Sequence, residues 1–335
     1  MKEKKEGKVI VVTLKASAAV REAIEEGLDG TAAAVYLDDI PEERRAEVLS
    51  SANAIMPFFF NKEVRESEYG MLDDVELLQS VSTGLEFLPF RKLPEKMILS
   101  CNAGGWAPQI AEHTVALLLA LTRRIVPLHN DLARGVFGRD AYSPASLRGK
   151  VLTVVGYGGI GRHTAELLRA FGMKVYALNT SGRTEDPVQF MGTLKDLPEI
   201  LPATDVLLMS LPLNRHTKGI IGGKELAFMK PNAILLNVAR AALVVEEDLY
   251  RHLKANPEFQ AGFDVWWKEP TWGGGPFALD HPFMELTNIV GSPHNSNRCE
   301  GDLANASRAA AANAAAFFRG EKIGGIIRRE DYIED

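Results

Sequence analysis

The sequence predicts an α/β fold that consists of two doubly wound parallel-sheet domains. Short apolar runs alternate with helical stretches along nearly the whole chain, as in parallel sheets that carry helices on both faces. The alternation occurs in two blocks, before residue 102 and after residue 150, and only the second block opens with a glycine-rich turn. A chain of 335 residues is long enough to bury two such cores.

The first block predicts five short strands and the helices between them. We expect the strands at 8–14, 32–36, 54–56, 77–81 and 97–100, and helices at 16–26 and 42–49. Apolar residues are nearly continuous in the predicted strands, as in strands that are buried on both faces. This block contains no glycine fingerprint, so we do not expect it to bind a dinucleotide.

A long apolar helix is predicted at 107–125, and an irregular segment at 126–150. The helix contains Glu112, His113 and two arginines, so a membrane span is a poor interpretation and a buried helix fits better. We interpret His113 as a structural residue. The apolar helix and the irregular segment together predict a homodimer.

Residues 151–180 carry the strongest functional signal. An apolar strand at 151–155 leads into Gly156, Gly158 and Gly161, followed by a helix at 160–171 and a second strand at 175–178. The three glycines permit a tight turn, a close approach of backbone to a pyrophosphate, and packing of helix on strand. The helix N-terminus offers N–H groups to the phosphates, here with Gly159 and Ile160. The order of these elements favours a dinucleotide site over a plain tight turn.

The end of the second strand bears on cofactor choice. An NAD-selective site usually has Asp or Glu there, but this chain has Asn179, which does not repel a 2′-phosphate. Thr180, Ser181 and Arg183 add two hydroxyls and a guanidinium that suit a phosphate. We therefore predict NADP as the preferred cofactor and NAD as the alternative. A solvated loop with Arg183 in water is the competing interpretation.

The rest of the chain repeats the α/β pattern and supplies the candidate catalytic residues. We expect strands at 206–210, 233–238, 261–265 and 289–291, helices at 225–229 and 246–255, and a final Ala-rich helix at 299–319. Ligands bind beyond the carboxyl ends of such strands. Three of these ends are followed by Arg240, by Asp264 and Glu269, and by His294, which form a plausible catalytic set. The simpler alternatives are a surface ion-pair partner for Arg240, a solvated turn for Glu269 and a capped loop for His294.

These motifs carry a family resemblance that covers nearly the whole chain. The segments are STGLEF at 82–87, IAEHTVALLLAL at 110–121, VVGYGGIGR at 154–162, LPLNRHTKGIIG at 211–222, LLNVARAALV at 235–244, DVWWKEP at 264–270 and SPH at 292–294. The chain resembles the D-2-hydroxyacid dehydrogenases, and most of all archaeal glycerate-dehydrogenase-like and hydroxypyruvate/glyoxylate reductase members. The resemblance implies a Rossmann NAD(P)-binding domain inserted in a flavodoxin-like substrate domain. It also implies hydride transfer between NAD(P)H and a small 2-oxo or 2-hydroxy acid.

The resemblance also implies roles for individual residues. Arg240 would hold the substrate carboxylate and carbonyl, His294 would donate the proton, and Glu269 would be the partner of His294. The remaining matched positions are Thr83 and Gly84, which would bind the carboxylate through backbone N–H groups, Asp264, which would contact the nicotinamide carboxamide, and Val238 and Ala239, beside the cofactor. The chain departs from the family at Ala241, where glycine is usual, and at Asn295-Ser296-Asn297, where an apolar-Ala-Gly run is usual.

The order of the two patterns predicts discontinuous domains. We expect a substrate-binding domain at 1–102 and 299–335, and a Rossmann domain at 103–298. The alternatives to a hydroxyacid dehydrogenase are a formate- or phosphite-type dehydrogenase and a cofactor-sensing, corepressor-like binding protein. Thr83 stands where phosphite enzymes have lysine, and Glu269 stands where formate enzymes have glutamine.

Bulk composition limits the partners. The net charge of −6 gives no reason to expect nucleic acid or an anionic membrane. Two cysteines cannot form a disulfide framework or a thiolate metal site, and we expect no metal. The first apolar run is too short for a membrane span. These features together predict a cytoplasmic protein.

Overall fold

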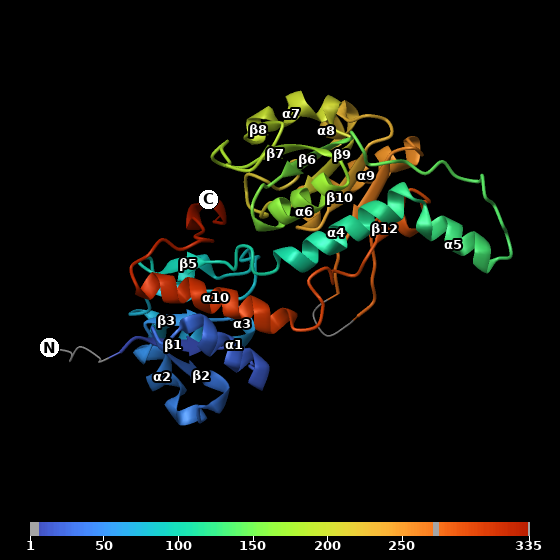
Figure 1. The fold of residues 1–335 in the computed structure, drawn as a ribbon. Coiled ribbons are helices and arrows are strands. Elements are labelled where there is room, and N and C mark those ends of the chain that lie inside the picture. The colour runs from blue at the N-terminus through green and yellow to red at the C-terminus, as the bar shows by residue number, and fades with distance from the viewer. Residues whose placement is uncertain (1–6, 271–274, 334–335) are drawn as a thin grey trace. The chain divides into compact units, whose positions relative to one another are not determined.

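The computed structural model describes residues 7–270 and 275–333, which form two compact units (Figure 1). The first unit runs to Trp106 and resumes at Cys299, and the second unit is Ala107–Arg298. The division after Trp106 lies slightly beyond the predicted limit at 102. The reason is local, because the buried Trp106 indole donates to the carbonyl of Val81 at 2.7 Å and so ties residues 103–106 to the first unit.

The first unit contains a five-stranded parallel sheet. Its strands, in the order β2-β1-β3-β4-β5, are β2 (Ala33–Tyr36), β1 (Val9–Val12), β3 (Ala54–Met56), β4 (Leu77–Gln79) and β5 (Ile98–Ser100). This is the flavodoxin-like strand order. Continuous burial of β3 and β4 explains why these segments read as unbroken apolar runs in the sequence.

The two longest helices of the first unit pack against each other, although they lie far apart in the sequence (Figure 1). They are α1 (Ala18–Leu28) and α10 (Asp302–Phe318), and the shorter helices are α2 (Arg45–Ser51) and α3 (Phe60–Glu63). Ser17 begins α1 by accepting the N–H of Val20, and Asp29 ends it in the left-handed conformation. The Ala-rich sequence of α10 permits this close approach, because small side chains line its buried face.

The second unit contains a seven-stranded parallel sheet. Its strands, in the order β12-β11-β10-β9-β6-β7-β8, are β12 (Ile289–Gly291), β11 (Gln260–Phe263), β10 (Ile234–Asn237), β9 (Val206–Met209), β6 (Val151–Val155), β7 (Lys174–Leu178) and β8 (Phe190–Gly192). The six strands from β8 to β11 follow the dinucleotide-binding order 3-2-1-4-5-6, and the order reverses between β6 and β9.

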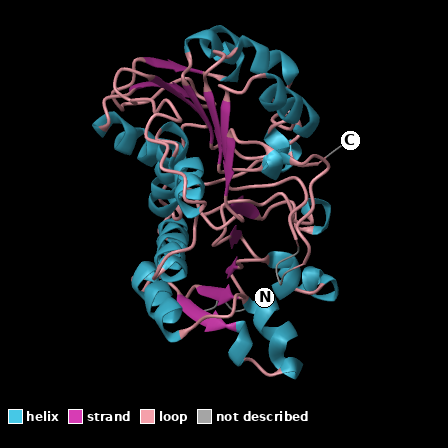
Figure 2. Cartoon of the chain, turned by 90° about the vertical axis from the view of Figure 1, so that its right-hand side faces the viewer, coloured by secondary structure: helices cyan, strands magenta, loops and turns pink. Residues whose placement is uncertain are grey.

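Helices cover both faces of the second sheet (Figure 2). They are α4 (Ala107–Thr122), α5 (Ile125–Ala133), α6 (Gly159–Ala170), α7 (Leu197–Ile200), α8 (Gly223–Phe228) and α9 (Glu246–Ala255). The apolar helix α4 packs on α6 and on strands β10, β11 and β12, which accounts for apolar residues all round its circumference. The predicted fold class is confirmed in both units.

Two expectations about local structure were wrong. Residues 125–133 form a helix rather than irregular chain, and α4 ends at Thr122. The break between the helices lies at Arg124, which has a left-handed φ of 54°, and Pro127 falls in the first turn of α5, where a missing N–H is tolerated. The short edge strand β8 was also not predicted, because its three residues carry no periodic signal of their own.

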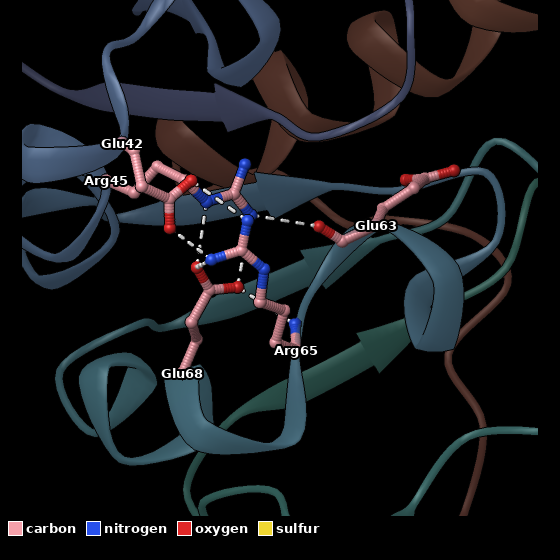
Figure 3. Close-up of polar contacts among 5 residues, drawn as sticks. All are labelled: Glu42, Arg45, Glu63, Arg65 and Glu68. Atoms are coloured by element: carbon pink, nitrogen blue, oxygen red, sulfur yellow. Dashed lines mark hydrogen bonds and ion pairs between the residues drawn. The ribbon is translucent and has the colours of Figure 1, made fainter.

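A network of charged side chains ties α2 to the segment that follows α3 (Figure 3). Arg45 donates to both oxygens of Glu68 at 2.8 and 3.1 Å and to the carbonyl of Glu63 at 3.2 Å. Arg65 pairs with Glu42 at the surface.

Across 7–270 and 275–333, no helix has both the length and the apolar character that a membrane span requires.

Candidate active site

The glycine-rich turn after β6 has the geometry that its sequence predicts. Gly156 has a φ of +98°, and a Cβ there would approach the backbone N of Leu211 to 2.6 Å. A Cβ on Gly161 would lie 2.6 Å from Val154 Cγ1, so only glycine lets α6 pack on β6. Gly158 differs, because a Cβ there would meet no atom within 4 Å. This glycine therefore borders open space, where a ligand can approach the backbone.

The N-terminus of α6 can hold an anion. Gly158 is the N-cap and supplies no side-chain hydrogen bond, and the first amide to bond within the helix is that of Arg162, to the carbonyl of Gly158. Within the described residues, the N–H groups of Gly159, Ile160 and Gly161 have no protein acceptor. These three amides and the positive end of the helix dipole suit the pyrophosphate of a dinucleotide.

The loop after β7 is shaped by the Asn179 side chain. Its Oδ1 accepts the backbone N–H groups of Ser181 at 3.0 Å and Gly182 at 2.7 Å, and its Nδ2 donates to the carbonyl of Arg183 at 2.9 Å. Arg183 is exposed, and its guanidinium has no hydrogen-bond or ion-pair partner in the part of the chain that the structure describes. Thr180 and Ser181 are exposed beside it.

Arg240 lies three residues beyond the end of β10. Asn237, the last residue of that strand, accepts the N–H of Ala239 at 3.1 Å and donates to the carbonyl of Arg240 at 2.9 Å. The Arg240 side chain is half-buried, and its Nη1 donates to the carbonyl of Ala239 at 2.7 Å. Ala241 is buried with an ordinary backbone conformation, so its position does not require the glycine that the resemblance leads one to expect.

His294 and Glu269 form a direct pair. Nδ1 of His294 lies 2.7 Å from Oε2 of Glu269, and the other carboxylate oxygen accepts the backbone N–H of Trp266 at 2.8 Å. Both side chains are partly exposed. Because the carboxylate holds the Nδ1 side of the ring, Nε2 is the nitrogen that could take part in proton transfer to a ligand.

Asp264 directly follows β11, and its side chain is completely buried. Its Oδ1 accepts the hydroxyl of Ser292 at 2.6 Å and the N–H of Asn295 at 3.0 Å, and its Oδ2 accepts the N–H of Ser296 at 3.0 Å. These contacts indicate that the carboxylate organises the loop after β12. The expected contact of Asp264 with the cofactor stays a prediction.

Trp266 also contacts the loop after β12. Its indole Nε1 donates to the carbonyl of Ser292 at 2.8 Å, and a Cβ on Gly291 would lie 2.3 Å from its Cζ2. The indole thus packs directly against glycine backbone.

In the first unit, the loop after β4 contains Thr83 and Gly84. Ser80 Oγ accepts the N–H of Ser82, and Ser82 Oγ donates to the carbonyl of Gly84, so the loop is held by its own hydroxyls. Among the described residues, the N–H groups of Thr83 and Gly84 have no acceptor. Two neighbouring amides of this kind suit a carboxylate.

Comparison with known proteins gives the family. A family model described as D-isomer specific 2-hydroxyacid dehydrogenase, NAD binding domain, matches residues 115–296. This match spans more than half of the chain and includes the glycine turn, Arg240, Glu269 and His294. The chain therefore belongs to the D-isomer specific 2-hydroxyacid dehydrogenase family, and the resemblance inferred from its motifs is confirmed. A nicotinamide dinucleotide site in the second unit agrees with this membership.

Three relatives illustrate the range of similarity. Glycerate dehydrogenase of Methylorubrum extorquens is 32% identical over 238 residues, which are 69% of this chain and 72% of the relative. A crystal structure of a glycerate dehydrogenase related protein from Thermoplasma acidophilum is 28% identical, with a TM-score of 0.63, and the match covers 92% of this chain and 99% of that chain. D-3-phosphoglycerate dehydrogenase of Methanocaldococcus jannaschii is 30% identical over 261 residues, 77% of this chain. The chain spans about half the length of that enzyme, namely 47%.

One contact near the site was not predicted from the sequence. The Nε2 atom of His113, which we interpreted as a structural residue, lies 2.7 Å from the hydroxyl of Ser292, 179 positions further along the chain. No local pattern links two residues so far apart, and only the packing of α4 against β12 brings them together. The residues that the structure describes contain no cluster of three or more His, Cys, Asp or Glu side chains that could hold a metal ion.

Proposed function

We propose that this chain is an NAD(P)-dependent D-2-hydroxyacid dehydrogenase that reduces a small 2-oxo acid such as glyoxylate or hydroxypyruvate, or oxidises the matching 2-hydroxy acid. The observation that carries the proposal is the His294–Glu269 pair, with 2.7 Å between Nδ1 and Oε2, in the same unit as a glycine turn with open amides. Family membership supports the same activity.

In this proposal, each residue has a chemical task. The bound nicotinamide supplies or accepts the hydride at the substrate carbon. His294 donates a proton from Nε2 to the carbonyl oxygen as negative charge develops there, and the Glu269 carboxylate holds the ring through Nδ1. Arg240 stays charged and can bind a planar carboxylate through two hydrogen bonds. The amides of Thr83 and Gly84, in the first unit, are proposed to bind a carboxylate.

We further propose NADP as the preferred cofactor. The support is the Asn179 loop, in which a neutral carboxamide stands at the end of β7 and the exposed Arg183 guanidinium has no partner among the described residues. A homodimer and a cytoplasmic location remain proposals.

The test of this function is a panel of substrates with both cofactors. Consumption of NADPH and NADH is measured with glyoxylate, hydroxypyruvate, pyruvate and 3-phosphohydroxypyruvate, and NADP⁺ and NAD⁺ reduction is measured with formate and phosphite. Turnover of 2-oxo acids supports the proposal. Turnover of formate or phosphite alone supports the other dehydrogenase type, and tight cofactor binding without any turnover supports a cofactor-sensing protein.

A further inference from the structure

A continuous chain of hydrogen bonds in the second unit links three side chains, those of His113, Ser292 and Asp264. Nε2 of His113, on helix α4, lies 2.7 Å from Oγ of Ser292. The Ser292 hydroxyl in turn lies 2.6 Å from Oδ1 of Asp264, and His113 Nε2 is 3.7 Å from the same oxygen. The chain connects α4 to the residues that follow β11 and β12.

The donors and acceptors fix the direction of this chain. A hydroxyl has one proton, and that of Ser292 is donated to the Asp264 carboxylate. Ser292 must therefore act as the acceptor toward His113, so the imidazole carries a proton on Nε2. A neutral histidine in this tautomer is sufficient for the contact.

The far end of the chain is the backbone around His294. Asp264 accepts the N–H of Asn295 and of Ser296 with its side chain, and its carbonyl accepts the N–H of His294 at 2.7 Å. His294 has a left-handed φ of 51°, a conformation that is strained for a residue other than glycine and persists only where neighbouring contacts hold it. The Asp264 hydrogen bonds supply such contacts.

We propose that His113 is a positioning residue for His294. Its Nε2–H donates a hydrogen bond to the Ser292 hydroxyl, which orients that hydroxyl toward Asp264. The Asp264 carboxylate is thereby kept in place, where it holds the left-handed turn at His294. The inference rests on the proposed function only for the role of His294 in catalysis. The hydrogen-bond chain itself is a property of the folded second unit.

Burial of the Asp264 carboxylate explains why each member of this hydrogen-bond chain is needed. Asp264 is completely buried, and a buried carboxylate is stable only when hydrogen bonds replace its hydration. Loss of the Ser292 donor would leave Oδ1 with one backbone donor, and loss of His113 would free the Ser292 hydroxyl to rotate. Either change should loosen the turn without removing a group that touches substrate.

Four substitutions test the proposal. His113→Leu and Ser292→Ala break the chain, whereas His113→Gln retains an N–H donor at a similar reach and Ser292→Thr retains the hydroxyl. The exposed neighbour on the same helix, Glu112→Gln, is the matched control. The two disruptive changes should lower kcat roughly 10–100-fold, the range expected when a reacting group is misplaced by about 1 Å. The KM for the cofactor should change less than kcat, since the glycine turn is untouched.

A second measurement does not depend on activity. Amide hydrogen exchange of the segment 294–297 should be slow in the unmodified protein and faster in His113→Leu and Ser292→Ala, with His113→Gln, Ser292→Thr and Glu112→Gln unchanged. Unchanged exchange and kcat in His113→Leu, or a Gln variant as impaired as the Leu variant, would overturn the proposal. If the unmodified protein turns over no 2-oxo acid but the exchange pattern is as expected, the proposed function fails while the positioning role stands.

Discussion

At the residue scale, proton transfer depends on how Glu269 holds His294. Both Glu269 oxygens are engaged, one by His294 and one by the Trp266 amide, so the carboxylate cannot rotate away. We expect His294→Ala to lower kcat for carbonyl reduction by roughly 10²–10⁴, the usual contribution of a general acid. Steady-state kinetics measures this loss. Cofactor affinity measured by titration should be unchanged, and a parallel loss of cofactor binding would mean that the substitution disturbs the fold.

Substitution of Glu269 tests its electrostatic task separately. Glu269→Gln keeps one oxygen, which can still accept the Trp266 N–H, but replaces the other oxygen with a donor and removes the negative charge beside the His294 ring. The kcat of carbonyl reduction should therefore fall, but by less than in His294→Ala, because the proton donor itself remains. Steady-state kinetics of the two variants and the unmodified protein provides the measurement. An unchanged kcat in Glu269→Gln would show that the carboxylate does not assist His294.

Cofactor selectivity is a second property set by single residues. A charge-assisted hydrogen bond contributes about 1.5–3 kcal/mol, and each 1.4 kcal/mol is a tenfold change in affinity. One bond from Arg183 to a 2′-phosphate should thus favour NADPH by roughly 10–150-fold, and by less because the side chain is exposed. Arg183→Ala should reduce the ratio of kcat/KM for NADPH over NADH, and adding Asn179→Asp should reverse it. A ratio in favour of NADH in the unmodified enzyme contradicts the proposal.

Site residues could be predicted from the sequence where the residue type and its spacing both point to the same structure. The glycine turn could be predicted because each glycine answers a local steric need, as the Gly156 and Gly161 geometries show. The pairing of Glu269 with His294 was accessible only through family resemblance, since 25 residues separate them. The His113–Ser292 contact could not be predicted, because a histidine on an apolar helix has the same local pattern whether or not it reaches a distant serine.

At the scale of elements, packing rather than propensity decides the contact between α1 and α10. A Cβ on Gly27 would lie 2.4 Å from the carbonyl O of Arg308 and 2.7 Å from the Cβ of Ala311. Alanine favours a helix over glycine by about 1 kcal/mol, so propensity alone predicts that Gly27→Ala stabilises the protein. We expect the opposite, a loss of about 1–3 kcal/mol from overpacking.

Urea unfolding measures this difference. Gly70→Ala is the matched control, because a Cβ at Gly70 meets no atom within 4 Å and its φ needs no glycine. That control should be neutral or slightly stabilising. Equal stability of the Gly27 variant and the original protein would indicate that α1 and α10 do not approach each other as closely as the structure has them.

The charged network around α2 is the second prediction at this scale (Figure 3). Burial opposes ionisation of Glu68, but hydrogen bonds from Arg45 and from the Arg65 amide outweigh it, so the pKa of Glu68 is lowered. Arg45→Met should lower the free energy of unfolding by about 1–3 kcal/mol, because a buried charged acceptor loses its partner. The neighbouring exposed pair gives the control, since Arg44→Met should cost less than about 1 kcal/mol.

The sign of the pH dependence follows from the lowered pKa. Glu68 binds fewer protons when folded than when unfolded, so its contribution to stability is present above its unfolded pKa, about 4.3. That contribution is lost as pH falls through the lower pKa of the folded state. The loss of stability between pH 6 and pH 3 should be smaller in Glu68→Gln than in the unmodified protein, as measured by urea unfolding. An identical loss of stability in the two proteins would show that Glu68 does not contribute to acid sensitivity.

Some elements could not be predicted for physical reasons. Helix α5 begins at a left-handed arginine and has proline in its first turn, and the sequence pattern of such a start resembles that of a loop. Strand β8 has only three residues and owes its existence to pairing with β7. The longer helices and the buried strands were predictable because each matches one period over its whole length.

At the scale of the whole molecule, the first unit is completed by the end of the chain. Helix α10 packs on α1, and the guanidinium of Arg329 donates to carbonyl groups of that unit, those of Phe90, Leu93, Pro94 and Met97. Burial lowers the pKa of Arg329, but the arginine remains charged at any ordinary pH. The first unit therefore needs residues that lie more than two hundred positions apart, and such non-local contacts slow folding.

The last prediction concerns assembly, and it rests on apolar residues that the second unit leaves exposed. Leu132 on α5 is 56% exposed, and Phe137 just beyond it is 86% exposed. Ile125, Val126 and Val136 are also exposed on this segment. Exposed apolar side chains gathered on one short segment are typical of a protein interface, so we expect a homodimer that buries more than about 1,000 Å².

Sedimentation equilibrium at micromolar concentration provides the measurement. The unmodified protein should be a dimer, and Leu132→Asp combined with Phe137→Asp should be a monomer, because two buried charges oppose association without touching the core of either unit. Phe228→Asp is the matched control, since Phe228 is an exposed aromatic residue on α8, away from this segment, and should leave the dimer intact. A monomeric unmodified protein would contradict the prediction, and a dimer that survives the double substitution would place the interface elsewhere.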